Sequence, residues 1–170
     1  MLIAHLPSGY LLGRSLRARG PVMMAALTGA VAPDLDMLWF TFVDSSIHHH
    51  RFWPHIPAVW ATIALVALPL IAARRRLWLA AATTFFAAVL MHLILDTPTG
   101  GIMWLWPFSD HLFTLMTVPA TRTHWVLSFM LHWTFLAEII LCAAALSLLL
   151  RRGAATAEPA QPSADKDPGR

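Results

Sequence analysis

Long apolar runs separated by short basic clusters dominate the pattern of hydrophobic and polar positions along the chain. A helix that crosses the bilayer core, about 30 Å thick, needs roughly 20 residues. Three runs with few or no charges approach that length, at residues 57–73, 77–95 and 125–150. No strand-like alternation of useful length accompanies them. The pattern therefore predicts an all-α protein, a multi-pass membrane helical bundle.

A fourth apolar stretch, residues 22–43, is interrupted by the letters APDLD. Pro21 suits the first turn of a helix, whereas Pro33 disfavours helical geometry at Ala32. We therefore expect a broken helix here. Its first part runs from about Pro21 to Ala32, and a second short helix follows the break at Pro33.

The two ends of the chain differ from this apolar core. Residues 1–20 place their basic side chains after the apolar part, which is the wrong order for a cleaved signal peptide. We expect them to remain in the mature protein. Residues 153–170 are polar and rich in Pro, Ala and Ser, which is typical of disorder. The predicted organisation is a helical membrane domain over residues 1–152 and a disordered tail over residues 153–170.

Composition supports the membrane class. Hydrophobic residues make up 58% of the chain and charged residues only 12%, whereas about a quarter of the residues in a soluble domain are charged. The single cysteine, Cys142, excludes a disulfide framework within one chain and a Cys-rich zinc site. The net charge of +3 comes from short arginine clusters rather than one broad basic face. This arrangement favours membrane orientation over nucleic-acid binding.

The arginine clusters predict which end of each helix faces the cytoplasm. They lie at residues 14–19, 74–76 and 151–152, and all three are compatible with one side of the membrane. The positive-inside rule makes that side cytoplasmic. The loops at residues 45–55 and 97–124 then face the opposite side.

Five ionisable side chains from separate segments share one predicted depth. Counting 1.5 Å per residue from the basic side, Asp34 lies at about 20 Å, His92 at about 22 Å and His55 at about 28 Å. Asp36 and Asp96 follow within about a turn. A carboxylate at this depth is costly unless it is paired or wetted, and neighbouring carboxylates repel each other. A divalent cation bound by carboxylates and neutral imidazoles would satisfy the whole set.

Each motif taken alone also has a structural interpretation. His92 and Asp96 are four residues apart, on one helical face, where they could bind a metal or simply hydrogen-bond to each other. Asp34 and Asp36 could both turn toward one point after the break. They could equally be a helix N-cap and a first-turn acid.

The letters HHHRFWPH, at residues 48–55, gather four histidines and an arginine before an apolar run. His50 and His55 flank a turn that Pro54 is expected to shape, and both are candidate ligands. Histidines here could also be interfacial. His5 is a further candidate ligand, with a structural role as its alternative.

Two other acidic residues are less clearly assigned. Asp110, in the predicted outer loop, could bind metal, position substrate or be solvated. Glu138 lies about 20 Å from the basic side. We expect it to be a buried partner of Arg51 or of a histidine, with metal ligation as the alternative.

These motifs, in this order, resemble the YdjM-like family, described as LexA-binding, inner-membrane-associated, metal-dependent hydrolases. The resemblance covers roughly residues 1–110. It rests on His5, on PDLD at 33–36, on HRFWPH at 50–55 and on HLILDTPTGG at 92–101 followed by WPF. The family's second histidine motif reads His-Arg-Gly-x-Thr-His-Ser. His50, Arg51 and His55 match it, whereas Phe52, Pro54 and Ile56 depart from it.

The resemblance implies a multi-pass metal-dependent hydrolase of the bacterial inner membrane. It also suggests a looser similarity to zinc-dependent phospholipase C enzymes, which use a His-x-x-x-Asp helix motif. LexA binding is implied by the family description alone, because no surface for it is evident in the sequence. The oligomeric state is not indicated.

The resulting hypothesis is a metal site near one membrane face. Its candidate ligands exceed the four of one closed zinc site, so one or two ions are expected, zinc first, with manganese and iron as alternatives. The metal would activate a water against an ester or phosphoester of a lipid or lipid-linked substrate. Arg51 would neutralise an anionic group, and Asp34 or Asp110 would be the general base. The other hypothesis is a non-enzymatic metal-binding membrane protein or transporter. The predicted metal ligands are His5, Asp34, Asp36, His50, His55, His92 and Asp96.

Overall fold

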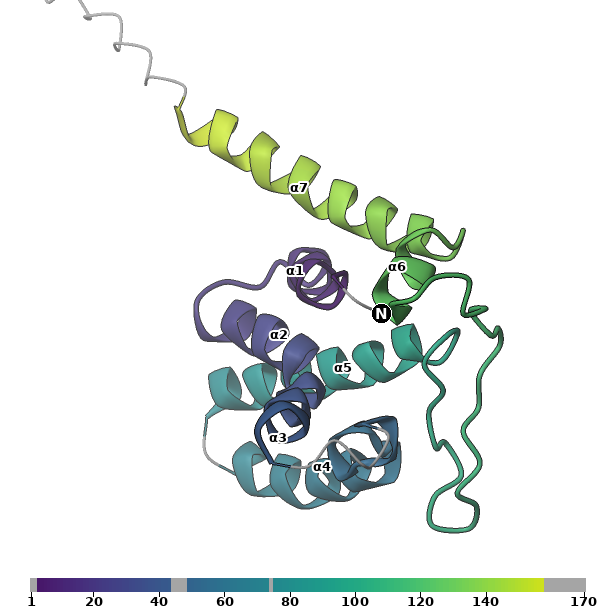
Figure 1. The fold of residues 1–170 in the computed structure, drawn as a ribbon. Helices are drawn as coiled ribbons and strands as arrows, with labels where there is room; N and C mark the ends of the chain where they lie inside the picture. The colour runs from purple at the N-terminus through teal and green to yellow at the C-terminus, as the bar shows by residue number, and fades with distance from the viewer. Residues whose placement is uncertain (1–2, 44–48, 74, 158–170) are drawn as a thin grey trace, which may run out of the picture.

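The described residues of this computed structural model are 3–43, 49–73 and 75–157. Their regular elements are helices, and a long irregular segment covers residues 97–124 (Figure 1). The described residues contain no strand, only an isolated antiparallel bridge between Ile102 and Phe113. Three 3-10 turns join the first helices: η1 (Pro33–Leu35), η2 (His49–Arg51) and η3 (Trp53–His55). The α-helices are α1 (His5–Ser15), α2 (Pro21–Val31), α3 (Asp36–Phe42), α4 (Pro57–Ala72), α5 (Arg76–Asp96), α6 (Trp125–Met130) and α7 (Phe135–Ala157).

Helix α5 is the centre of the bundle. It packs most extensively against α2, and α4 lies along another of its faces. The close approach of α2 and α5 requires a glycine, because a Cβ at Gly29 would overlap the backbone of Phe85 and touch Ala88. Small residues allow helix backbones to approach in this way. Helix α1 then packs on α2. The start of α1 and the end of α2 therefore both lie near the end of α5.

The predicted broken helix is confirmed. Helix α2 ends at Val31, the turn η1 begins at Pro33, and α3 leaves at a bend of 55°. Pro33 lacks a backbone N–H and cannot continue the helical hydrogen bonding. The break sets Asp34 and Asp36 at the corner, where Asp34 lies near His92 of α5 and Asp36 contacts His55 in η3.

The predicted third span, residues 125–150, is wrong as a single helix. The structure divides it into α6 and α7. Between them His132 Nδ1 lies 2.8 Å from Thr134 Oγ1. Such local side-chain bonds compete with helical hydrogen bonding. Helix α7 continues to Ala157, past the predicted domain boundary at residue 152, and residues 158–170 of the predicted tail lie outside the described residues.

Within the described residues, one helix, Arg76–Asp96, is long and apolar enough to cross a membrane. The bent pair α2 and α3 would make a second if it is counted as one span, and α4 is a shorter apolar helix. Length and composition therefore support one or two spans. The multi-pass arrangement stays a prediction.

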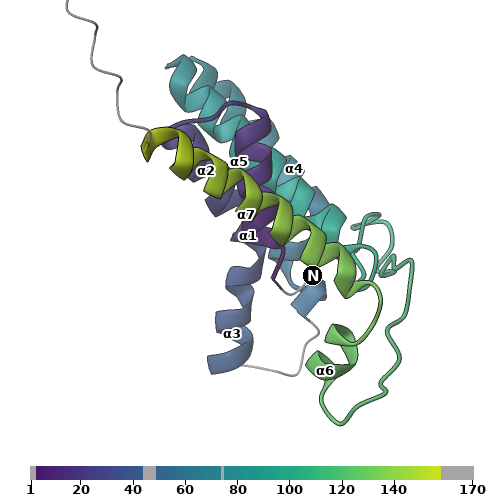
Figure 2. The ribbon, with the colours of Figure 1, turned by 90° about the horizontal axis from the view of Figure 1, so that it is seen from above.

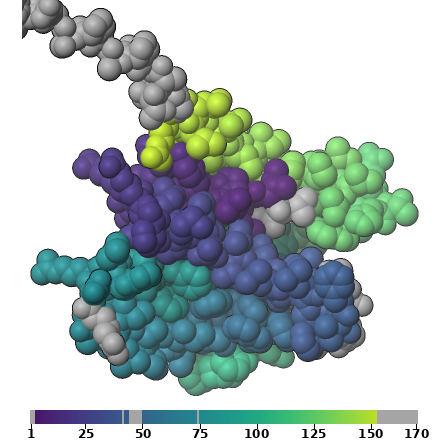
Figure 3. Space-filling model, turned by 90° about the vertical axis from the view of Figure 1, so that its left-hand side faces the viewer, coloured from purple at the N-terminus to yellow at the C-terminus, as the bar shows by residue number. Residues whose placement is uncertain are grey.

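Helix α7 lies across α1 on the outside of the bundle, as the two ribbon views show (Figures 1 and 2). In the space-filling view the yellow C-terminal helix lies directly on the purple N-terminal segment (Figure 3). The contact includes Glu138, a fully buried carboxylate. Its Oε2 accepts the backbone N–H groups of Ile3 and Ala4, at 2.6 and 3.1 Å. Glu138 thus holds the start of α1.

Candidate metal centre

The last two turns of α5 carry the first pair of functional side chains. His92 and Asp96 are 0% and 1% exposed, and His92 Nε2 lies 3.1 Å from Asp96 Oδ2. Both side chains face inward, as the four-residue spacing predicts. An imidazole and a carboxylate are therefore fixed together, away from solvent, at the end of the central helix.

The other nitrogen of His92 fixes the orientation of its ring. Its Nδ1 lies 2.7 Å from the backbone carbonyl oxygen of Ala30. A carbonyl only accepts, so Nδ1 carries the proton and donates it. In the neutral ring Nε2 then has a lone pair, and it has no hydrogen-bond partner among the described residues. A buried lone pair of this kind is suited to a metal ion.

Asp34 reaches the same point from η1, on the corner after α2. Its Oδ1 lies 3.7 Å from His92 Nε2 and also 3.7 Å from His55 Nε2. Its side chain is 37% exposed, whereas the others in the cluster are buried. Asp34 is therefore the member of the cluster that solvent reaches most easily.

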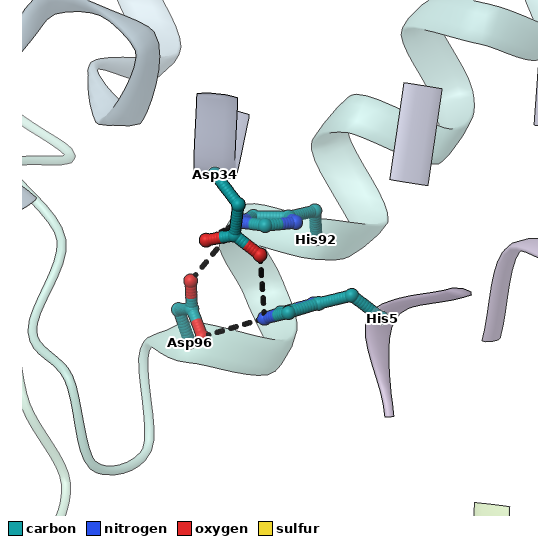
Figure 4. Close-up of side chains that lie close together, drawn as sticks. All are labelled: His5, Asp34, His92 and Asp96. Carbon is teal, nitrogen blue, oxygen red and sulfur yellow. Dashed lines mark hydrogen bonds and ion pairs between the residues drawn. The ribbon is translucent and has the colours of Figure 1, made fainter. Parts of the chain in front are cut away.

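His5 enters from the start of α1. Its Nε2 lies 3.1 Å from Asp96 Oδ1 and 4.0 Å from Asp34 Oδ2. Its ring stacks on that of His92, with centroids 3.7 Å apart. Figure 4 shows these four side chains converging from three segments of the chain. We call His5, Asp34, His92 and Asp96 the helix group, because helices α1 and α5 carry all but Asp34.

A second set of histidines approaches Asp96 at Oδ2, the oxygen that His92 also faces. His55 is fully buried, and its Nε2 lies 3.8 Å from Asp96 Oδ2. His50 Nε2 lies 3.7 Å from the same oxygen. We call His50, His55 and Asp96 the loop group, because both histidines lie in the short turns η2 and η3.

The loop-group rings are also oriented through Nδ1. His50 Nδ1 lies 2.7 Å from the carbonyl oxygen of Gly100, and a Cβ at that glycine would collide with the His50 ring. His55 Nδ1 lies 2.9 Å from Asp36 Oδ2. Since carbonyl and carboxylate oxygens accept, both Nδ1 atoms donate, and both Nε2 atoms face Asp96. A carboxylate behind a histidine is the usual outer partner of a metal ligand.

The two groups together fit a metal ion. In each group the ligand atoms all lie within 4.8 Å of one another, and Asp96 belongs to both. Imidazole nitrogens and carboxylate oxygens suit zinc, iron and manganese. The sites could therefore hold a divalent cation, and the shared carboxylate could join two. The chemistry of these donors alone does not select the metal.

The surroundings of the loop group raise the pKa of His55. Burial by itself would lower the pKa of His55, but hydrogen bonding to Asp34 and Asp36, with the nearby charges of Asp36 and Asp96, raises it to about 9. Without a metal, His55 is therefore protonated at neutral pH. A cation would occupy the position of that proton.

Some predicted site residues lie outside the two groups. Asp36 lies behind His55 and accepts a hydrogen bond from its Nδ1. It therefore supports a predicted ligand and does not itself face the centre. Arg51 and Asp110 pair with each other at 3.9 Å, with side chains 47% and 87% exposed. Neither residue belongs to the groups that could hold a metal among the described residues.

Several groups that support the centre carry little or no signal in the sequence. Glu138 was expected to pair with Arg51 or a histidine, and in the structure its carboxylate accepts the backbone N–H groups of Ile3 and Ala4. Its predicted depth indicated that it is buried, although not what it binds. The carbonyls of Ala30 and Gly100 have no side-chain signal in the sequence at all.

Comparison with known proteins identifies the family. A family model described as YdjM inner membrane protein matches residues 1–157, and the chain belongs to this family. The match extends beyond the expected residues 1–110 and includes α7. No curated protein and no solved structure matches the chain.

Proposed function

We propose that this member of the YdjM inner membrane protein family is a metal-dependent hydrolase. Its substrate is an ester or phosphoester of a lipid or lipid-linked molecule. The observation that carries the proposal is the set of ring nitrogens directed at Asp96. His50, His55 and His92 each donate through Nδ1 to a fixed acceptor and face the carboxylate with Nε2. Histidines that bind a metal through one ring nitrogen commonly donate a hydrogen bond from the other.

In this proposal the helix group and the loop group would each hold one ion, and Asp96 belongs to both groups. Its Oδ1 faces His5, whereas its Oδ2 faces His50, His55 and His92. Zinc is the first candidate, with manganese and iron as alternatives. When bound, the metal supplies a water of lowered pKa and polarises an ester or phosphoester oxygen.

The chain's own residues supply the remaining chemistry. Asp34, partly exposed at the mouth of the cluster, accepts a proton from the attacking water as general base. Asp110 is the alternative base. Arg51, half-exposed and paired with Asp110, attracts an anionic group such as a phosphate, exchanging one carboxylate partner for another anion. Asp36 holds His55 in orientation through its Nδ1.

The lipid substrate follows from the predicted position of the centre in the membrane. Asp96 ends α5, and the basic cluster at residues 74–76 lies beside its start. With the basic end in the cytoplasm, the centre lies in the opposite, outer leaflet of a multi-pass bundle. Headgroups of that leaflet are then the nearest esters and phosphoesters.

The test measures metal content, hydrolysis and metal flux on the same purified protein. The probe for hydrolysis is ethyl p-nitrophenyl phosphate, a phosphodiester that releases a coloured phenolate. Metal-loaded wild type is expected to cleave it, and His92→Ala to lose at least about 100-fold of the rate. The matched control is His111→Ala, in an exposed loop. Metal flux into proteoliposomes, with no cleavage of any ester probe, would instead support a transporter.

A further inference from the structure

An apolar cavity adjoins the loop group at Asp36 and Pro54. Its volume is about 600 Å³, within the usual range of roughly 300–1,000 Å³ for a ligand pocket. The walls come from α2, α3, η3, α4 and α5, and five aromatic rings dominate them. These are Trp39, Phe52, Trp53, Trp60 and Phe85.

The cavity and the candidate metal centre share walls. Asp36 lines the cavity and also contacts His55 Nδ1 at 2.9 Å. Pro54, another lining residue, directly precedes His55 in η3. A molecule in the cavity therefore lies next to the loop group.

The cavity offers its occupant almost no polar group. Thr28 donates its hydroxyl to the carbonyl of Met24 at 2.9 Å, and Trp60 donates its indole N–H to the carbonyl of Pro54 at 2.7 Å. The side chain of Asp36 is fully buried against His55. Among the residues that the structure describes, no basic side chain lines the space. The occupant is therefore apolar rather than a headgroup.

The apolar surface continues in one direction. A second cavity of about 560 Å³ also includes Thr28 and Phe85 in its walls, and reaches Trp78 near the start of α5. The two cavities thus follow α2 and α5 from the end with the candidate centre toward the end with the arginines. A lipid whose headgroup lies at the centre would point its chain the same way, toward the middle of the bilayer.

The two cavities together are called the groove here. We propose that the groove binds one hydrocarbon chain of the substrate and thereby holds the ester or phosphoester at the candidate metal centre. The inference rests on the proposed function for the headgroup. It adds the recognition element: the substrate is a molecule with a single long chain, selected by chain length. Thr28, which lines both cavities, marks the position that should separate short from long chains.

The test compares alkyl p-nitrophenyl phosphates with chains of two, six and ten carbons. The variant is Thr28→Phe, which places a ring where the two cavities meet. Its matched control is Thr62→Phe on α4. Both threonines are exposed and donate to the carbonyl four residues earlier, but Thr62 lines neither cavity. The full chain is studied in an amphipathic polymer, with probes below their micelle concentration.

The expected result is a rise in kcat/KM with chain length in wild type and in Thr62→Phe. Each methylene moved out of water contributes up to about fourfold, so at least tenfold is expected from two to ten carbons. Thr28→Phe should cleave the two-carbon probe normally and lose most of that rise. An equal rise in Thr28→Phe would overturn the groove proposal while leaving the hydrolase proposal standing.

A second readout works even if no probe is cleaved. Bromine quenches nearby indoles, and the groove walls include Trp39, Trp53 and Trp60. Saturable quenching by 10-bromodecyl phosphate in wild type and Thr62→Phe, reduced in Thr28→Phe, would support the groove although the hydrolase proposal had failed. Equal quenching in all three proteins would overturn it.

Discussion

The helix group and the loop group meet at Asp96 but are supported in different ways. The helix group is held by packing between helices, through the close approach of α2 and α5 at Gly29 and the start of α1 under α7. The loop group lies on two short turns, and single acceptors orient its rings, the Gly100 carbonyl for His50 and Asp36 for His55. The comparison indicates that one half of the centre depends on the bundle and the other on individual hydrogen bonds.

The largest effect is expected from Asp96→Ala, because both groups share this carboxylate. The variant should lose the metal from both halves and all hydrolysis of the ethyl probe. Elemental analysis of purified protein measures the first and p-nitrophenolate release the second. Asp110→Ala, which removes a carboxylate from the exposed loop, should keep its metal. Full metal content in Asp96→Ala would show that Asp96 is not a ligand.

A smaller effect, confined to the loop group, is expected from Asp36→Asn. The change weakens the acceptor behind His55 Nδ1, and losses of such outer partners typically reduce metal affinity by about 10–100-fold. Competition with a coloured chelator measures the affinity of each half. We expect the metal affinity of the loop group to fall and that of the helix group to stay unchanged. Equal weakening of both halves would contradict the separation of the two groups.

The loop group should also respond to pH. The pKa of His55 is raised to about 9 without metal, so a metal ion must displace its proton at any pH below that value. Apparent affinity should therefore rise about tenfold per pH unit between pH 7 and 9, then level off. Calorimetric titration at several pH values measures this slope. A flat profile between pH 7 and 9 would mean that His55 does not bind the metal.

The same raised pKa of His55 predicts that the metal-free protein becomes less stable as the pH rises, whereas its metal affinity increases. Because the folded pKa exceeds the ordinary value of about 6.5, protonated His55 stabilises the fold fully below pH 6.5. That contribution is lost as the pH rises toward about 9. Metal-loaded protein should lack this loss, since its His55 carries no proton to release. Thermal unfolding of both forms across pH 6–9 tests the contrast.

The smallest effect on metal binding, and one confined to the helix group, is expected from Glu138→Ala. Removing the acceptor takes away the partner of the part-buried N–H of Ile3 and of the buried N–H of Ala4, at a cost of about 1–3 kcal/mol in unfolding free energy. His5 follows directly in α1, so its hold on the centre should weaken. Glu138→Gln, which keeps an acceptor, should recover most of both losses. Loss of loop-group metal in Glu138→Ala would point to general misfolding.

The sequence predicted the residues of the centre better than their supports. Depth along each helix placed His92, Asp34 and His55 in one layer, and the four-residue spacing placed Asp96 beside His92, because helical geometry is regular. Pro33 predicted the break for an equally local reason. The role of Asp36 behind His55 could not be predicted, since it depends on how η3 packs against α3.

Other features depend on tertiary contacts that no local pattern reports. The break between α6 and α7 falls inside a hydrophobic run, where the bond of His132 to Thr134 is one of several local alternatives. Glu138 binds backbone groups at the far end of the chain. The length of the helices likewise left the number of spans open, because α4 is shorter than the bilayer core requires.

If the helix group and the loop group, which share Asp96, each bind a metal ion, the number of ions per chain should reveal it. Elemental analysis would compare wild type with His92→Ala, which removes a ligand of the helix group, and His50→Ala, which removes a ligand of the loop group. The account predicts about two ions per chain in wild type and about one in each variant. A wild-type protein that binds no ion when metal is supplied, or variants that both retain two, would contradict it.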